Sequence, residues 1–203
     1  MNPLEKLAEH FKKFPGIGPR QARRFAYFVL SQHADLFNEL VSSMQNVREK
    51  VTQCESCLIY FTHESTEREC GYCRNPRRSI GSLIVVEKDV DVQVIEKSGA
   101  YNGMYFVLGG IIPLHEDTVP KYVHLQALIR RITHLIPRGL SEIIFALSAN
   151  SEGDATQQKI QTLLTSSINK KIKISVFGRG LSTGTEIEYL DSDTLKSALN
   201  GRK

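Results

Sequence analysis

Four cysteines are the residues of this chain whose spacing points most directly to chemistry. The chain has 203 residues, and Cys54-x-x-Cys57 is followed, after twelve residues, by Cys70-x-x-Cys73. Each pair can present two thiolates to one ion, and two pairs complete a tetrahedron around zinc. Four thiolates leave no open coordination position, so the predicted Zn²⁺, one per chain, is structural. The alternatives are two unrelated thiol pairs or a redox pair. His63 could substitute for one of the ligands, but because the cysteine set is complete we expect it to be a solvated loop residue.

A glycine-rich turn near the N-terminus is the second candidate site. Residues 14–22, FPGIGPRQA, have the form of a helix-hairpin-helix turn. Its two glycines allow close approach to a phosphate at a helix N-terminus, and the second proline suits a first helical turn. No acidic residue lies between Phe11 and Ala34, and the basic residues there are Lys12, Lys13, Arg20, Arg23 and Arg24. This pattern predicts sequence-independent contact with DNA phosphates. The alternative is an ordinary turn between helices with a solvated basic face.

The elements around these two sites divide the chain into regions of different character. Apolar residues at helical spacing predict an all-helical head over residues 1–50. Residues 51–79 hold every cysteine and few aliphatic residues, so without a metal this module could not offset its ordering entropy. From residue 80 onward, strand and helix patterns alternate. The predicted strands are 83–86, 105–108, 142–147 and 171–177, and the predicted helices are 90–97, 122–136 and 153–168; residues 194–199 close the chain.

This alternation predicts an α/β fold with a parallel sheet flanked by helices. The predicted domains are therefore a helix-hairpin-helix domain over 1–50, a four-cysteine zinc finger over 51–79, an α/β domain over 80–178, and a C-terminal segment over 179–203. We expect the last segment to serve in oligomerisation.

Composition excludes a membrane protein and favours the cytoplasm. The net charge is +4, from 26 basic and 22 acidic residues, and hydrophobic residues make up 41% of the chain. No window of about eighteen uncharged apolar residues exists, and the N-terminus lacks the apolar region of a secretory signal. In the cytosol thiols stay reduced, which favours metal binding over disulfides.

The order of these motifs resembles the RecR family of bacterial recombination mediators. The hairpin and the cysteine module are followed by further matching segments along nearly the whole chain. These segments are CRNPRR at 73–78, LIVVE at 83–87, YFVLGG at 105–110, EGDAT at 152–156, RGL at 179–181 and EIEYLD at 186–191. The resemblance implies that the α/β domain is a Toprim domain.

The resemblance also implies partners and site residues. RecR proteins form ring-like homotetramers that can encircle DNA, and they act in recombinational DNA repair as cytoplasmic, nucleoid-associated proteins. With RecO, and in some pathways RecF, they load RecA onto gapped or single-stranded DNA. Arg20 and Arg24 match the DNA-contacting positions of the family, and the four cysteines match its zinc ligands. Glu87 and Glu152 match Toprim acidic residues, the latter in the region that meets RecO.

The sequence departs from active Toprim enzymes at two metal-binding positions. Those enzymes hold Mg²⁺ with a glutamate and an Asp-x-Asp pair. Aligned on Glu-Gly, Ser148 and Asn150 stand where the two aspartates would be, although Glu87, Glu152 and Asp154 remain. We therefore predict no catalytic chemistry; the alternative is a Mg²⁺-dependent nuclease or primase-like enzyme with an altered acidic site. The segments 111–120, 148–151 and 182–185 also differ from the family pattern.

Overall fold

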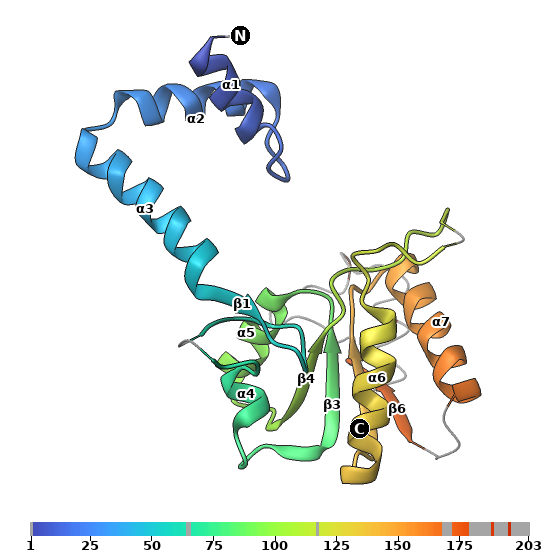
Figure 1. Cartoon of the computed structure of the whole chain (residues 1–203). Helices are drawn as coiled ribbons and strands as arrows, with labels where there is room; N and C mark the ends of the chain where they lie inside the picture. The colour runs from blue at the N-terminus through green and yellow to red at the C-terminus, as the bar shows by residue number, and fades with distance from the viewer. Residues whose placement is uncertain are drawn as a thin grey trace. The chain divides into compact units, whose positions relative to one another are not determined.

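The protein consists of two compact units, Met1–Val51 and Thr52–Lys203, which are described separately below (Figure 1). The computed structural model describes residues 2–63, 66–116, 118–167 and 172–178, together with Glu188 and Leu195. Apart from those two residues, the C-terminal segment over 179–203, with the altered segment 182–185 and the closing residues 194–199, therefore lies outside the described residues.

From residue 2 to residue 50, the regular elements of the N-terminal unit are all helices, as predicted. It contains α1 (Pro3–Phe11), α2 (Pro19–Ser31) and α3 (Ala34–Lys50). The side chain of Asn2 caps α1 by accepting a hydrogen bond of 3.0 Å from the backbone N–H of Leu4. Helices α1 and α2 pack through small buried residues, which let two helices approach closely. These residues are Ala8, Ala22 and Ala26.

The cysteine module is built from short elements that lean on the sheet. Strands β1 (Val51–Gln53) and β2 (Tyr60–Thr62) pair with each other, and α4 (Gly71–Arg74) follows. The backbone N–H of Val107, on the edge strand of the main sheet, donates a 2.9 Å hydrogen bond to the carbonyl oxygen of Cys57. The module therefore covers a sheet edge that would otherwise expose unpaired backbone groups.

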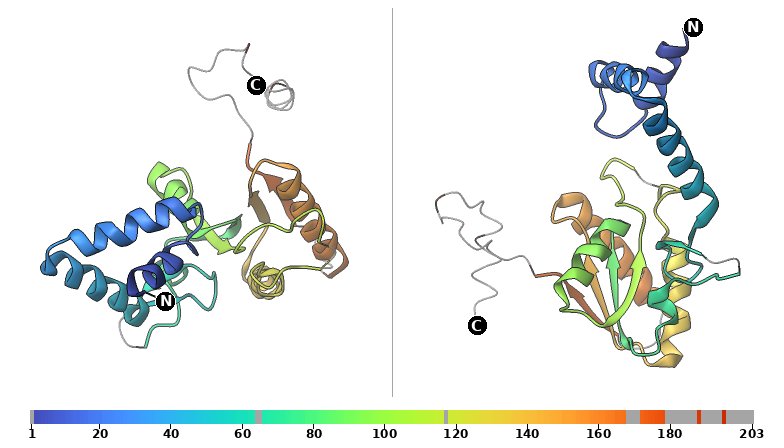
Figure 2. Two further views of the ribbon diagram at one scale, coloured as in Figure 1. Left: turned by 90° about the horizontal axis from the view of Figure 1, so that it is seen from above. Right: turned by 90° about the vertical axis from the view of Figure 1, so that its left-hand side faces the viewer.

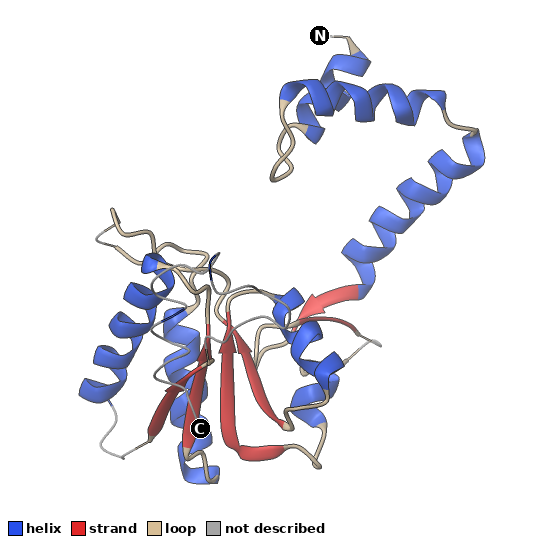
Figure 3. Cartoon of the chain, turned by 180° about the vertical axis from the view of Figure 1, so that it is seen from behind, coloured by secondary structure: helices blue, strands red, loops and turns tan. Residues whose placement is uncertain are grey.

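The predicted parallel sheet is present, with four strands among the residues that the structure describes. Its strands are β3 (Ser79–Val86), β4 (Gly103–Val107), β5 (Glu142–Ala146) and β6 (Lys173–Val176), in the order β4-β3-β5-β6 (Figure 3). Each neighbouring pair is parallel. Helices α5 (Asp89–Ser98), α6 (Leu125–Leu135) and α7 (Ser151–Ser167) and the 3₁₀ turn η1 (Ile136–Arg138) complete the unit.

Both faces of the sheet are covered, as a parallel sheet requires. Leu83 and Val85 pack in one core with residues of α6 and α7, whereas Ile84 and Val86 pack in a second core with α5 and the cysteine module. Helices α6 and α7 accordingly lie on the same side of the sheet (Figure 2). The buried cysteines belong to the second core, so the module shares its hydrophobic contacts with the sheet.

Helix boundaries follow local hydrogen bonding more closely than the apolar pattern. The predicted helix over 122–136 begins only at Leu125, because the N–H of His124 donates to the carbonyl oxygen of Leu108 at 2.8 Å. Gly109 permits this turn: it has φ +91°, and an added Cβ would lie 2.2 Å from the Tyr122 carbonyl oxygen. At Gly99, by contrast, the predicted helix end is confirmed by a left-handed φ of 64°.

Within the described residues, no helix combines the length and apolar character needed to cross a membrane.

Candidate functional site: a four-cysteine centre, a basic hairpin and a modified carboxylate site

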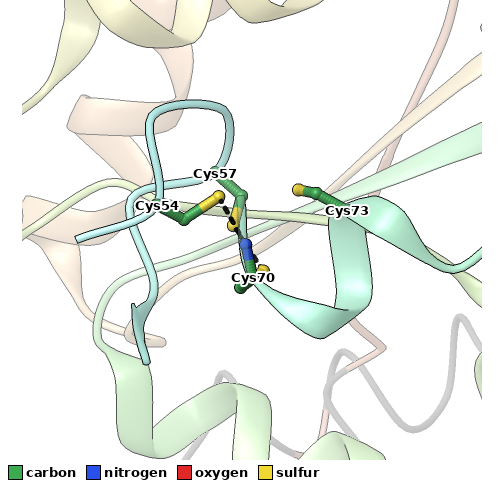
Figure 4. Close-up of side chains that lie close together, drawn as sticks. All are labelled: Cys54, Cys57, Cys70 and Cys73. Carbon is green, nitrogen blue, oxygen red and sulfur yellow. Dashed lines mark hydrogen bonds between the residues drawn. The ribbon is translucent and has the colours of Figure 1, made fainter. Parts of the chain in front are cut away.

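The four cysteine sulfurs converge on one point, as the sequence predicts (Figure 4). All four sulfur atoms lie within 4.8 Å of one another. Cys54, Cys57 and Cys70 are buried, and Cys73 is half-buried. A tetrahedral zinc site with Zn–S bonds of about 2.3 Å places its sulfurs roughly 3.8 Å apart, so this donor set fits zinc.

Backbone turns place the two cysteine pairs. The N–H of Leu58 donates to the Cys54 carbonyl oxygen at 3.0 Å, and Leu58 itself has a positive φ of 64°. In the second pair, the N–H of Cys70 donates to the sulfur of Cys54 at 3.3 Å. Such N–H···S bonds stabilise thiolates, as a structural metal site requires.

Hydrogen bonds among the sulfurs shift their pKa values in opposite directions. The hydrogen bond with Cys57 is the largest influence lowering the pKa of Cys54, whereas the hydrogen bond with Cys54 raises the pKa of Cys57. Binding zinc through all four sulfurs would release protons, so acid would weaken metal binding.

A buried arginine fixes the segment that follows the last cysteine. Arg78 is 9% exposed, and its guanidinium lies 2.6 Å and 3.2 Å from the two carboxylate oxygens of Glu96. It also stacks on the rings of Tyr72 and Tyr105, at 5.2 Å and 5.0 Å from their centroids. This bidentate pair lowers the pKa of Glu96 and ties the cysteine module to α5 and β4.

The basic hairpin has the geometry expected of a phosphate-binding turn. Gly16 is left-handed, with φ +76°, and Gly18 precedes α2 without any side chain of the described residues capping that helix. Pro19 occupies the first helical position, and the N–H groups that follow it point out of the helix start. The five predicted basic residues are all exposed: Lys12, Lys13, Arg20, Arg23 and Arg24.

Two of these five cations lie close to acidic residues. Lys12 is 3.6 Å from the carboxylate of Glu9. Arg23 lines a cavity of about 550 Å³ together with Glu5 and Glu9 of α1. Arg20 and Arg24, one helical turn apart, share a different part of the helix surface. Among the described residues, Lys12 is thus the one cation of the five with an ion pair, and Arg23 is the one that lines this cavity.

The carboxylate site of the Toprim pattern is brought together but reorganised. Glu87 follows β3 and is 8% exposed, and the hydroxyl of Ser148, 61 residues away, donates to its carboxylate. Lys88 contributes an ion pair at 3.1 Å. Burial alone would raise the pKa of Glu87, but the hydrogen bond from Ser148 and the pair with Lys88 outweigh it and leave the pKa lowered.

The second altered position has become a helix cap. The side-chain oxygen of Asn150 accepts a 2.8 Å hydrogen bond from the N–H of Gly153, in the first turn of α7. Gly153 is required because an added Cβ would lie 2.0 Å from the Ser148 carbonyl oxygen. Glu152 is half-buried in the same turn. Among the described residues, only the cysteines form a cluster of three or more potential metal ligands.

Sequence reasoning missed the buried arginine of α6. Arg131 is 7% exposed and its Nη2 lies 3.5 Å from the sulfur of Cys73. A signal was present, since Arg131 stands three residues after Leu128 and beside Ile132, on the apolar face of the helix. A charged residue at such a position needs a partner.

Comparisons with known proteins agree with this architecture. Residues 4–48 match the family model described as RecR, helix-hairpin-helix; residues 81–177 match the Toprim domain; and residues 180–203 match RecR, C-terminal. Recombination protein RecR of Prochlorococcus marinus (strain MIT 9515) is 35% identical over 200 residues, covering 98% of this chain and 95% of the relative. The protein of the same name from Synechococcus sp. (strain RCC307) is 35% identical over 201 residues, covering 99% and 88%.

A relative from another organism gives the same result. Recombination protein RecR of Cutibacterium acnes (strain DSM 16379 / KPA171202) is 34% identical over 200 residues, covering 98% of this chain and 94% of the relative. With the helical hairpin, the clustered cysteines and the parallel sheet in matching order, the chain belongs to the RecR family of recombination and repair proteins.

Proposed function

We propose that this protein is a DNA-binding recombination mediator that acts with RecO, and with RecF in some pathways, to promote RecA loading onto gapped or single-stranded DNA. The observation that carries the proposal is the exposed cationic hairpin. Arg20 and Arg24 are exposed in the first two turns of α2, and the uncapped start of this helix follows the two glycines of the turn. Such an arrangement supports phosphate contact without base readout.

Removing the two arginines tests the DNA contact. Arg20→Ala with Arg24→Ala should weaken binding to single-stranded and duplex oligonucleotides at least tenfold. The slope of log K against log salt concentration should become shallower by about two. The matched control is Arg48→Ala with Lys50→Ala, which removes the same charge from the end of α3. Fluorescence anisotropy over a salt series measures both. Binding by the hairpin variant that equals the control would contradict the proposal.

We also propose that one structural Zn²⁺ is bound per chain by the four cysteines. The support is the convergence of four sulfurs, three of them buried. When bound, zinc would crosslink the two cysteine pairs and supply no catalytic position. Metal analysis of the purified protein should give close to one zinc per chain, and a value far below one would contradict this assignment.

The proposal includes no catalytic chemistry at the Toprim site. It is supported by the neutral Ser148 and Asn150, whose side chains are engaged with Glu87 and with α7. Neutral hydroxyl and amide groups cannot replace two carboxylates for Mg²⁺. Nicking and primer-synthesis assays with Mg²⁺ and Mn²⁺ test this point. Metal-dependent activity that disappears in Glu87→Gln would show instead that the protein is a nuclease or primase-like enzyme.

Helix α3 supports a homo-oligomer, as a dimer or a ring tetramer. None of its residues is buried, and a row of apolar side chains is exposed along it. These are Leu36, Phe37, Leu40, Val41, Met44 and Val47. We propose that a second copy covers this row, because exposed apolar patches of this kind mark interfaces. Leu40→Glu with Met44→Glu should lower the mass in sedimentation; an unchanged mass would count against α3.

Glu152 is the better placed of the two carboxylates proposed for RecO docking. It is only half-buried, whereas Glu87 is 8% exposed and already holds Ser148 and Lys88. Glu152→Gln should weaken capture of purified RecO, with Glu116→Gln, another half-buried carboxylate, as the control. Equal capture by both variants would remove Glu152 from the proposal.

A further inference from the structure

Arg131 presents a charge problem in the core. It is 7% exposed, lies among the buried residues of α6, and has a buried Nε without a hydrogen-bond partner. Within the described part of the chain, no carboxylate lies within ion-pair distance of it. Arginine stays charged in proteins, so its burial is strongly unfavourable unless an anion compensates it.

The group that Arg131 does contact is a cysteine sulfur. Its Nη2 is 3.5 Å from the sulfur of Cys73, which is 58 residues away in the sequence and is the least buried of the four cysteines. Zn²⁺ with four thiolates carries a net charge of −2. A guanidinium beside one thiolate would offset part of that charge, and the thiolates would in turn compensate the buried guanidinium.

Two of the neighbouring arginines are already paired with carboxylates. A cavity of about 220 Å³ beside Cys73 is lined by Arg74, Arg78, Arg131 and Arg138, and also by Glu69. Arg74 pairs with Glu67, and Arg78 pairs with Glu96. With Arg131 assigned to the thiolates, Arg138 is the remaining arginine of the cavity, and its Nη1 lies 3.3 Å from the Nε2 of His134.

We propose that Arg131 is a positioning residue of the zinc site that compensates the charge of the thiolates and links metal occupancy to the stability of α6. The inference rests on the zinc binding proposed above. When zinc is present, the arginine has a permanent anionic partner. When zinc is lost, the buried guanidinium loses the anionic zinc–thiolate centre beside it, so α6 becomes less stable against the sheet.

Zinc affinity separates this role from packing. Arg131→Met keeps a long side chain and removes the charge, and Arg131→Lys keeps the charge. Arg130→Met is the control, because Arg130 is the exposed neighbour on the same helix. A competing chromogenic chelator measures the zinc affinity of each full-length variant. We expect R131M to bind zinc about 10- to 100-fold more weakly than wild type, the usual effect of losing a residue that orients a metal ligand.

The remaining variants decide the cause. R130M and R131K should stay close to wild type. A packing defect would affect metal-bound and metal-free protein equally and leave the affinity unchanged, so an unchanged R131M overturns the inference. An R131K as weak as R131M also overturns it, because charge would then not be the cause. Zinc missing from the wild type overturns both this inference and the zinc proposal, whereas zinc-loaded wild type with an unaffected R131M overturns this inference alone.

Hydrogen exchange tests the link to α6 without any substitution. Stripping zinc from the wild-type chain should reduce amide protection in α6 more than in α7, the matched helix on the same face of the sheet. Equal changes in the two helices, or an α6 that is unaffected, would overturn the link.

Discussion

The cysteine cluster and the end of strand β3 are two polar sites in one unit, and they differ in how many potential metal ligands they contain. The first keeps a complete set of four ligands that converge within 4.8 Å. The second keeps Glu87 but has Ser148 and Asn150 at the other two positions, and each has taken a local hydrogen-bonding role. Within one unit, therefore, one set of polar side chains keeps a complete donor set that fits a metal, and the other is joined by hydrogen bonds.

The difference lies in what each region could do without metal. The cysteine module is short and polar and draws its burial from the sheet, so a crosslink adds stability that its own core cannot supply. The end of β3 is already held by the parallel ladder and by the cap on α7. There a serine can satisfy the buried carboxylate, and no ion is needed.

Removing one zinc ligand should have the largest effect. Cys57→Ser is expected to abolish zinc binding. It should also remove a large part of the free energy of unfolding of the Thr52–Lys203 unit, which for a typical domain is about 5–15 kcal/mol. His63→Ala is the control and should retain zinc, because the cysteine set is complete. Metal analysis and urea unfolding measure both. A cooperative, zinc-containing C57S variant would instead indicate that His63 or another group can replace the thiolate.

Rebuilding the lost carboxylates should have the next largest effect. Ser148→Asp with Asn150→Asp adds two negative charges, one of them directly against the buried Glu87, and should cost about 3 kcal/mol without divalent cations. Mg²⁺ should recover part of that loss in the variant and leave the wild type unchanged. Thermal unfolding with and without Mg²⁺ measures the shift. A variant that melts identically in both buffers would show that the positions no longer converge on a metal.

The cysteine cluster was easier to predict than the contacts of Glu87, because its residues lie closer together in the sequence. The cysteine pairs form knuckles within a few residues, so the ligand set could be predicted from the sequence alone. Glu87 and Ser148 are 61 residues apart, and their contact exists because β3 and β5 are parallel neighbours. The alignment of Ser148 with a lost aspartate predicted the absence of a ligand, but its hydrogen bond to Glu87 came only from the structure.

Charged residues on apolar helix faces were the least predictable part. The helical pattern over 122–136 predicted the apolar face of α6, and Arg131 breaks that pattern at a single position. Its partner, Cys73, belongs to another module, so no local rule connects them. The same reason applies to Arg78, which stood in a family motif but whose pairing with Glu96 depends on how α5 packs beside β4.

A smaller, pH-dependent effect should separate the hydrogen bond at Glu87 from its ion pair. Because the pKa of Glu87 is lowered on folding, its contribution to stability is complete above the unfolded value, about 4.3, and is lost as the pH falls through the folded value. Ser148→Ala removes one cause of the lowering and should cost about 1.5–3 kcal/mol at neutral pH. The difference from wild type should shrink below about pH 4. Zinc loss in acid affects both proteins alike, so paired urea titrations isolate this difference, and a pH-independent difference would contradict the assignment.

The cap on α7 should give the smallest effect and completes the comparison. Asn150→Ala removes the side-chain acceptor for the N–H of Gly153 and should cost about 1 kcal/mol, the usual value for a helix N-terminal cap. Asn150→Asp alone should cost less, because a carboxylate can accept the same hydrogen bond and favours a helix N-terminus. If N150D were instead the more destabilising of the two, repulsion from Glu87 would outweigh capping. The position would then still behave as part of a metal site, and the conversion seen at Ser148 would be incomplete.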